Sequence, residues 1–137
     1  MGASRPVMDL YDKPMWDSIG RRRMELQYCA QSGQYRYPPS PACPHCLSLD
    51  YEWRPISGHG EILSWVVFHR RYFDDYPPPY NVVAVRLAEG PIIVTNLVGP
   101  TPQGSWIGAQ VEICYETHAG RTINRVRLRD HAATAPN

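Results

Sequence analysis

The sequence has no long apolar run and almost no excess of charge of either sign. No hydrophobic stretch approaches the roughly 20 residues that a membrane-spanning helix needs, and the opening MGASRPVMDLYDKPMW has no apolar core typical of a secretory signal. With 14 Lys and Arg against 13 Asp and Glu, the formal net charge is +1, so no strong field favours nucleic acid or an anionic membrane. We therefore expect a protein of the cytoplasm without membrane attachment.

The sequence also lacks the short motifs of common catalytic sites. It contains no G-x-S-x-G, no phosphate-binding P-loop and no paired-glycine dinucleotide fingerprint, and its five histidines are scattered. No nucleophile stands beside its base in the sequence. A free-standing enzyme is thus the least supported interpretation, and we predict no catalytic residue in this chain.

Cysteine is scarce, but three of the four cysteines are clustered. Cys43 and Cys46 form a C-x-x-C knuckle, a spacing that lets two thiolates reach one metal ion. Cys29 begins a second knuckle, but Ser32 stands where its partner cysteine would be, followed by Gly33. The pattern predicts a rubredoxin-like zinc ribbon with one thiolate missing, and it suits a reducing cytoplasm better than a disulfide framework.

The missing thiolate leaves two interpretations of the ribbon open. Cys29, Cys43 and Cys46 could hold zinc with water or another side chain in the fourth place, although a serine hydroxyl is a poor ligand. Alternatively the ribbon needs no metal and is held by the packing of its tyrosines and prolines. His45 lies between the two knuckle cysteines, where its ring is expected to point away. Cys114, on a late strand, is expected to be an ordinary strand residue.

The chain before and within the ribbon predicts one helix and short strands. A helix from about Pro14 to Arg23 would follow Asp12 as its cap. Its arginine-rich end is either a solvated helix terminus or a cationic patch for an acidic or phosphorylated partner. Alternation predicts a strand over 24–28 and its return over 34–37, after which 47–53 leaves the ribbon. The 14 prolines argue against long helices.

After Pro55 the sequence predicts a small barrel. Alternating apolar residues and glycine-marked turns predict five strands, and this number and size suit an OB-fold: Glu61–His69, Tyr80–Leu87, Pro91–Val98, Ala109–Thr117 and Thr122–Leu128. The fold class is therefore mainly β, with an N-terminal helix, a ribbon and a five-stranded barrel. We divide the chain into an arm and helix (1–23), a ribbon (24–54), a barrel (55–129) and a tail (130–137).

A set of short motifs, in order, resembles one known family. The motifs are Pro38-Pro39-Ser40-Pro41, Cys43-Pro44-His45-Cys46, Ser57-Gly58-His59-Gly60, Ser64-Trp65, Pro79-Tyr80, Glu89-Gly90-Pro91 and Thr95-Asn96-Leu97-Val98. Together they resemble the rubredoxin-like zinc ribbon plus OB-fold family, a domain family of unknown function associated with acyl-CoA enzymes. The likeness runs from about Tyr11 to Arg127.

The resemblance implies a partner. Members of this family form complexes with thiolase-like proteins or acyl-CoA hydratases, in steroid side-chain degradation and acyl transfer. In such complexes the thiolase-like subunit usually holds the catalytic residues. We therefore expect an accessory, non-catalytic subunit that stabilises a thiolase-like aldolase or acyltransferase and shapes its substrate channel. Acyl-CoA would be the substrate of the complex, and a two-plus-two heterotetramer its form.

Two surfaces could make such contacts, and one rival function shares them. The end of the first barrel strand and the proline-rich loop 74–80 offer a contact for the partner or for acyl-CoA, through His69, Arg70, Arg71, Tyr72, Phe73, Tyr76 and Tyr80. The alternatives are a polar barrel rim and a rigid surface loop. The rival function is single-stranded nucleic-acid binding, because OB barrels elsewhere use aromatic platforms for it, but the basic residues form no cationic stripe.

Overall fold

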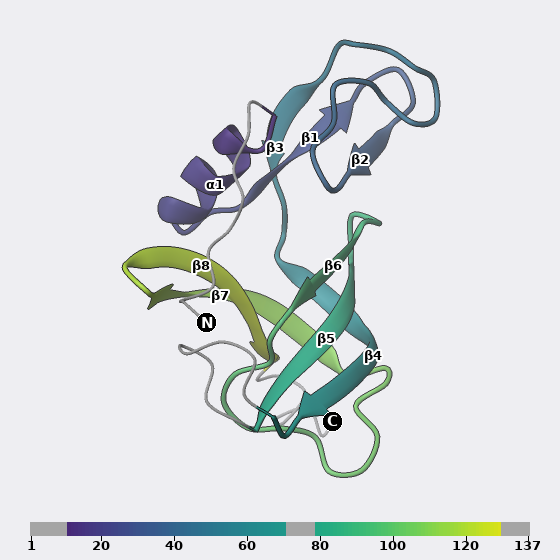
Figure 1. Cartoon of the computed structure of the whole chain (residues 1–137). Helices are drawn as coiled ribbons and strands as arrows, with labels where there is room; N and C mark the ends of the chain where they lie inside the picture. Colours follow the sequence, from purple (N-terminus) through teal and green to yellow (C-terminus); the bar gives the residue numbers. More distant parts are fainter. Residues whose placement is uncertain (1–10, 71–78, 130–137) are drawn as a thin grey trace.

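The computed structural model describes residues 11–70 and 79–129, which form a helix, a small ribbon sheet and a barrel (Figure 1). Helix α1 (Lys13–Gly20) has Asp12 at its N-cap and Pro14 in its first turn. It ends at Gly20 and not at the predicted Arg23. Arg21 N–H bonds back to the carbonyls of Asp17 and Ser18, and Arg22 takes a left-handed φ of 60°. The arginine trio therefore follows the helix.

The arginine after the helix fastens it to the barrel. The Arg22 guanidinium donates a hydrogen bond of 2.9 Å to the carbonyl of Tyr115. The Met24 N–H donates one of 2.7 Å to the Tyr115 hydroxyl. Both bonds bridge more than 90 residues of sequence, so tertiary contacts fix the end of α1.

The ribbon is a three-stranded antiparallel sheet with β1 (Glu25–Cys29) in the centre. The predicted return strand is β2 (Gln34–Arg36), which pairs with one side of β1. The other side pairs with β3 (Glu52–Pro55). This corrects the prediction that 47–53 leaves the ribbon: its last two residues, Glu52 and Trp53, already belong to β3, and Trp53 packs against the core.

The barrel contains the five predicted strands in the order β6-β5-β4-β7-β8. Their bounds differ from the prediction only at the ends: β4 (His59–Phe68), β5 (Tyr80–Leu87), β6 (Ile92–Thr95), β7 (Gln110–His118) and β8 (Arg121–Leu128). Alternation along β5 buries Val83, Val85 and Leu87 and turns Arg86 outward. Neighbouring strands in this order are antiparallel.

The two outer strands of this order then meet. Leu97, just after β6, forms a parallel bridge with Val126 of β8. Hydrogen bonds of 2.9 Å from Val98 N–H to the Val126 carbonyl and of 3.1 Å from Val126 N–H to the Asn96 carbonyl hold this junction. The sheet thus curls into the partly closed five-stranded barrel of an OB-fold, which confirms the predicted fold.

One packed core joins the helix, the ribbon and the barrel. Met15 and Ile19 of α1 and Leu26 of β1 are buried in the same cluster as the inward side chains of the barrel. In Figure 1, α1 lies beside β8, consistent with this packing. No described helix is both long and apolar enough to cross a membrane.

Candidate functional site

The three clustered cysteines meet in the ribbon. Cys29 is the last residue of β1, and Cys43 and Cys46 lie in the connection between β2 and β3. Their Sγ atoms are all within 4.8 Å of one another, and those of Cys29 and Cys46 are 3.6 Å apart. Cys29 and Cys43 are buried. The structure thus brings together the three residues that the sequence selected as metal ligands.

The two knuckles share two backbone features. In the first, Gly33 has φ of 73° and its N–H bonds to the Cys29 carbonyl at 2.7 Å. In the second, Leu47 has φ of 63° and its N–H bonds to the Cys43 carbonyl at 2.8 Å. Each first sulfur also has a backbone N–H nearby, from different positions of the two turns. Ser32 N–H, three residues on, lies 3.4 Å from Cys29 Sγ, and His45 N–H, two residues on, lies 3.4 Å from Cys43 Sγ.

These contacts favour the thiolate form of Cys29 and Cys43. The Ser32 hydroxyl is the main cause that lowers the pKa of Cys43 to about 6, helped by backbone N–H groups of the knuckle. The Ser32 hydroxyl and N–H also lower the pKa of Cys29. For Cys46, the Ser48 N–H favours the thiolate, but burial and the neighbouring Cys29 and Cys43 raise the pKa overall. Cys29 and Cys43 are therefore prepared to lose their protons, as a metal site requires, whereas Cys46 is not.

The donor set fits zinc. Zn²⁺ accepts thiolate sulfur at about 2.3 Å in a tetrahedral arrangement, which separates neighbouring sulfurs by about 3.8 Å. The 3.6 Å between Cys29 Sγ and Cys46 Sγ is close to that separation. A site with three sulfurs also excludes magnesium and calcium, which prefer oxygen. Zinc here would supply cross-links between the two knuckles, a structural contribution.

The polar residues beneath the knuckles explain the proline-rich motif. Ser40 of Pro38-Pro39-Ser40-Pro41 presents its N–H to Gln27 Oε1 at 2.8 Å and its carbonyl to Gln27 Nε2 at 3.0 Å. The Arg36 guanidinium is buried, bonds to both Gln27 and Ser40, and lies over the Tyr51 ring. The motif thus anchors the loop that carries Cys43.

The predicted contact residues are only partly described. His69 and Arg70 are exposed just after β4, and Tyr80 begins β5. The Tyr80 ring stacks on Phe68, with centroids 5.1 Å apart. Arg71, Tyr72, Phe73 and Tyr76 lie outside the described residues, as does most of the predicted contact loop 74–80.

Sequence reasoning missed an exposed apolar face on the outside of the barrel. The register places Ser64, Ala84 and Val94 in one row across β4, β5 and β6, and Val66 beside Val82 in the next. These residues lie on the face of the sheet that points away from the core, and the side chains of Val94 and Val66 are 65% and 51% exposed. The face continues to the stacked Phe68 and Tyr80. A bulge between Ile62 and Ser64 shifts the alternation, so the sequence did not show which valines face outward.

The fourth cysteine is not activated. Burial raises the pKa of the Cys114 thiol, so the thiol stays protonated at neutral pH. Cys114 borders a groove of about 580 Å³ that is also lined by Pro100, Pro102, Tyr115, Arg127 and Leu128. Arg127 is paired with Glu112 across the strands at 2.8 Å. The cysteine thus has the role of strand residue that the sequence predicted.

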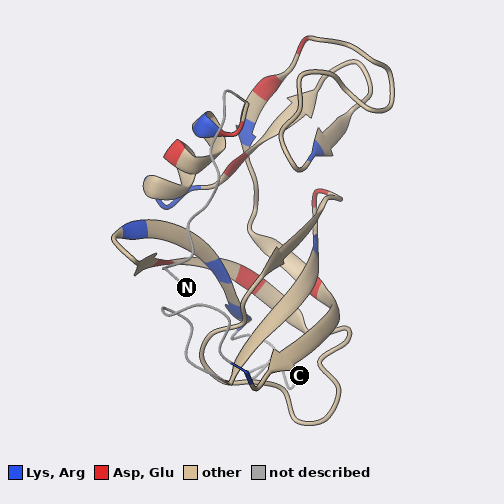
Figure 2. Cartoon of the chain, viewed as in Figure 1, with Lys and Arg blue, Asp and Glu red and all other residues tan. Residues whose placement is uncertain are grey.

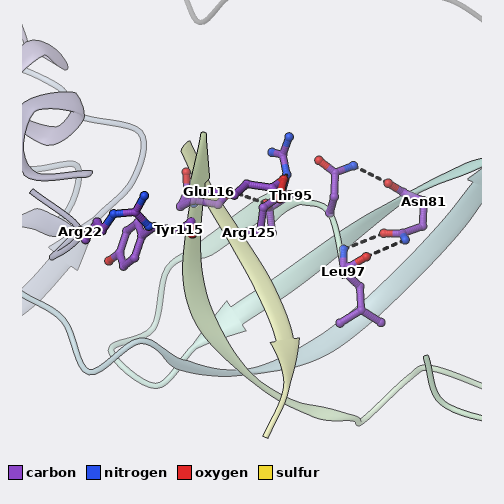
Figure 3. A network of polar contacts seen from close by, with 9 residues as sticks. Arg22, Asn81, Thr95, Leu97, Tyr115, Glu116 and Arg125 are labelled. Atoms are coloured by element: carbon purple, nitrogen blue, oxygen red, sulfur yellow. Dashed lines mark hydrogen bonds and ion pairs between the residues drawn. The ribbon is translucent and has the colours of Figure 1, made fainter. Parts of the chain in front are cut away.

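Two other motifs make structural contacts, one between the ribbon and the barrel and one between strands of the barrel. Glu89 of Glu89-Gly90-Pro91 accepts the Ser57 N–H at 2.7 Å, which joins the turn after β5 to the link between ribbon and barrel. Asn81, after Pro79-Tyr80, accepts the Leu97 N–H at 2.7 Å and donates to the Leu97 carbonyl at 2.9 Å (Figure 3). These motifs are therefore accounted for by structure.

The charged residues of the described ranges are of mixed sign. In Figure 2, blue and red residues are interspersed over α1, the ribbon and the barrel, without a continuous basic stripe on the described residues. The buried Arg125 is paired with Glu116 at 2.8 Å. This distribution does not favour the rival function of single-stranded nucleic-acid binding.

Comparison with known protein families finds matches for both parts of the chain. The family described as the rubredoxin-like zinc ribbon domain of ChsH2 matches residues 16–52, and the C-terminal OB-fold domain of ChsH2 matches residues 53–116. A solved structure described as "Ltp2-ChsH2(DUF35) aldolase" has a TM-score of 0.82 and 33% identity, covering 90% of this chain and 98% of that one.

Two curated proteins are also similar. A "Probable enoyl-CoA hydratase alpha subunit" of Thermomonospora curvata is 36% identical over 107 residues, 78% of this chain and 34% of that protein. A "DUF35 domain-containing scaffold protein" of Pyrococcus furiosus is 30% identical over 84 residues, 61% of this chain and 62% of that protein. The chain thus spans about a third of the first protein and less than two thirds of the second.

Proposed function

Because this chain belongs to the DUF35 family of ChsH2-like zinc ribbon and OB-fold proteins, we propose that it is a non-catalytic subunit of an acyl-CoA enzyme complex. Its partner would be a thiolase-like subunit that carries the catalytic residues of an aldolase or acyltransferase. The chain would stabilise that subunit and shape its substrate channel.

One observation carries this proposal: the likeness to the Ltp2-ChsH2(DUF35) aldolase extends over 98% of that solved chain at 33% identity. The names of the other relatives, a scaffold protein and an enzyme subunit, agree with an accessory role. The unactivated Cys114 thiol supports it too, because an exposed low-pKa cysteine would indicate a nucleophile.

The proposal extends to cofactor, compartment and assembly. Cys29, Cys43 and Cys46 would hold a structural zinc ion. The cytoplasm would keep these thiols reduced. Acyl-CoA would be the substrate of the complex, with a steroid side chain as the acyl group that the resemblance implies. A two-plus-two heterotetramer is the expected assembly, with a hydratase-like subunit as the other candidate partner.

We place the contact with the partner on the outer apolar face of β4, β5 and β6, together with His69, Arg70, Arg71, Tyr72, Phe73, Tyr76 and Tyr80. This face presents Val66 and Val94 to solvent and is free of charge in its middle rows. Exposed apolar side chains in a contiguous group are typical of protein–protein contacts. A thiolase-like subunit with an apolar surface of its own is the occupant that this face would fit.

Affinity purification of the tagged chain from its native cells tests the proposal. Bound proteins would be identified and quantified by mass spectrometry. We expect a thiolase-like or hydratase-like subunit in equal amount, and the purified complex, but not the chain alone, should turn over acyl-CoA thioesters. Steroid and straight-chain acyl-CoAs offered in parallel would identify the acyl group. Full turnover by the chain alone would overturn the proposal.

A surface variant tests the contact. Val94→Lys should weaken the purified complex by at least tenfold, because it places a charge in the apolar face. Ile107→Lys is the matched control, because Ile107 is 63% exposed like Val94 but lies on the loop before β7. Equal affinities of the two variants for the partner would exclude this face as the contact.

The rival function is tested separately. Titration of the chain with single-stranded oligonucleotides at low salt should show no binding.

A further inference from the structure

The first knuckle has an oxygen where the second has a sulfur. We propose that Ser32 is the fourth ligand of the ribbon's metal site, so that this chain binds zinc through three thiolates and one serine oxygen. The sequence alone left water, another side chain or a metal-free ribbon as alternatives. The site would bind metal whether or not the chain has an enzyme partner.

The matching conformation of the two knuckles positions Ser32. Gly33 and Leu47 share a left-handed φ, and each bonds to the carbonyl of the first cysteine of its knuckle. Ser32 therefore occupies the place in the first turn that Cys46 occupies in the second. Because Cys46 points into the cluster, the Ser32 side chain is directed there as well.

The distances between the side-chain atoms agree with this placement. Ser32 Oγ lies 3.4 Å from Cys43 Sγ, and Cys29 Sγ lies 3.6 Å from Cys46 Sγ. In a tetrahedral site with Zn–O of about 2.0 Å and Zn–S of about 2.3 Å, ligand oxygen and sulfur are about 3.5 Å apart and two sulfurs about 3.8 Å apart. The two pairs thus have the spacing of two opposite edges of such a tetrahedron.

The chemistry predicts a site that is weaker than a four-cysteine site. Zn²⁺ would replace the protons of three thiols, which leave as three H⁺, while the neutral serine hydroxyl binds through an oxygen lone pair and keeps its proton. The resulting centre carries a net charge of −1, compared with −2 for four thiolates. A neutral hydroxyl attracts Zn²⁺ less than a thiolate does. The three sulfurs still favour zinc over hard cations.

Variants of Ser32 test the assignment by zinc affinity, measured by competition with a chromophoric chelator under reducing conditions. We expect Ser32→Ala to weaken binding by at least about tenfold, because loss even of a residue that only supports a ligand typically costs about 10–100-fold in metal affinity. Ser32→Cys should strengthen binding by more than tenfold. Ser48→Ala is the matched control, because the Ser48 hydroxyl only accepts the Asp50 N–H and its backbone N–H is retained. Circular dichroism of each variant checks folding.

Two further readouts separate ligation from a hydrogen bond to sulfur. In Ser32→Asp the carboxylate can bind zinc but cannot donate a hydrogen bond to a thiolate, so this variant should bind zinc more tightly than Ser32→Ala. Removing a ligand changes the coordination of the metal, so the visible absorption bands of bound cobalt should differ between the natural chain and Ser32→Ala. If Ser32 only donated to sulfur, these bands would be the same. Cobalt in the Ser32→Cys variant should show stronger sulfur-to-metal absorption than in the natural chain. Equal zinc affinity of the natural chain and Ser32→Ala would overturn the proposal, as would the absence of zinc binding by both the natural chain and Ser32→Cys.

Discussion

The side chain of Asn81 pairs with the backbone of Leu97 as a neighbouring strand would. Its Oδ1 accepts the Leu97 N–H at 2.7 Å and its Nδ2 donates to the Leu97 carbonyl at 2.9 Å. Leu97 is buried, and it also forms the bridge to Val126 that joins the outer strands of the barrel. Asn81 therefore satisfies the backbone groups of the residue at which the sheet curls onto itself.

Replacing Asn81 by alanine should destabilise the fold. The Leu97 N–H and carbonyl would lose their partners in a buried position, so we expect the free energy of unfolding to fall by about 2–3 kcal/mol. Urea denaturation followed by circular dichroism measures this change. Gln103→Ala, on an exposed loop, is the control and should change stability by less than about 0.5 kcal/mol. A similar small effect at Asn81 would show that the closure does not depend on this pair.

Two glycines with different surroundings should respond oppositely to alanine. At Gly60 a Cβ would lie 2.6 Å from Val85 Cγ1 and 2.8 Å from the Arg86 carbonyl oxygen. Gly60→Ala should therefore cost about 3 kcal/mol or more. At Gly20, in the last turn of α1, nothing lies within 4 Å, so Gly20→Ala should be neutral or stabilise by up to about 1 kcal/mol. Thermal and urea denaturation measure the stability of both variants. A Gly60→Ala variant more stable than the Gly20→Ala variant would contradict the prediction.

The Glu89 carboxylate should contribute to the junction between ribbon and barrel. Glu89→Ala leaves the Ser57 N–H without its 2.7 Å partner, and we expect a loss of about 1–2 kcal/mol in unfolding free energy. Glu89→Gln keeps an acceptor oxygen but loses the charge, so its loss should be smaller. Urea denaturation of the two variants in parallel gives the comparison. If Glu89→Gln lowered the free energy of unfolding as much as Glu89→Ala, the hydrogen bond to the Ser57 N–H would not be the cause of the loss.

Stability should fall at alkaline pH because two tyrosines are held protonated. Burial raises the pKa of Tyr115, against the opposing Met24 N–H, and burial followed by the Asp12 charge raises the pKa of Tyr37. A raised pKa in the folded state means that their contribution is complete below the ordinary tyrosine pKa of about 10 and is lost as pH rises through the folded values. Tyrosinate absorbance near 295 nm, compared between the natural chain and the Tyr37→Phe and Tyr115→Phe variants, should show that these two tyrosines ionise above about pH 10. Ionisation of either one at or below this pH in the folded chain would contradict this.

The sequence predicted those parts of the fold that depend on residues close together in the chain. The alternation of apolar and polar residues predicted the barrel strands, because one face of each strand is buried. The spacing of Cys29, Cys43 and Cys46 predicted the cysteine cluster. The predicted end of α1 was wrong because the actual end depends on the hydrogen bond from Arg22 to Tyr115, which lies far along the chain. The third ribbon strand was missed because its pairing with β1 joins residues 24 to 30 positions apart, which no local pattern shows.

The candidate sites divide in the same way. The spacing of residues identified Ser32 as the position that lacks a thiolate. Only the three-dimensional structure shows that its hydroxyl lies 3.4 Å from Cys43 Sγ. The outer face of the barrel could not be read from the strand pattern, because the bulge between Ile62 and Ser64 changes which residues of β4 face outward.

The core that α1, β1 and the barrel share also determines how the molecule melts. Met15, Ile19 and Leu26 lie in one cluster with the buried residues of the barrel strands, so the ribbon cannot unfold alone without exposing apolar surface of the barrel. Heating should therefore produce one calorimetric transition, with equal calorimetric and van't Hoff enthalpies. An ion bound only at the knuckles would then raise the melting temperature of the barrel, although it touches none of the barrel's strands.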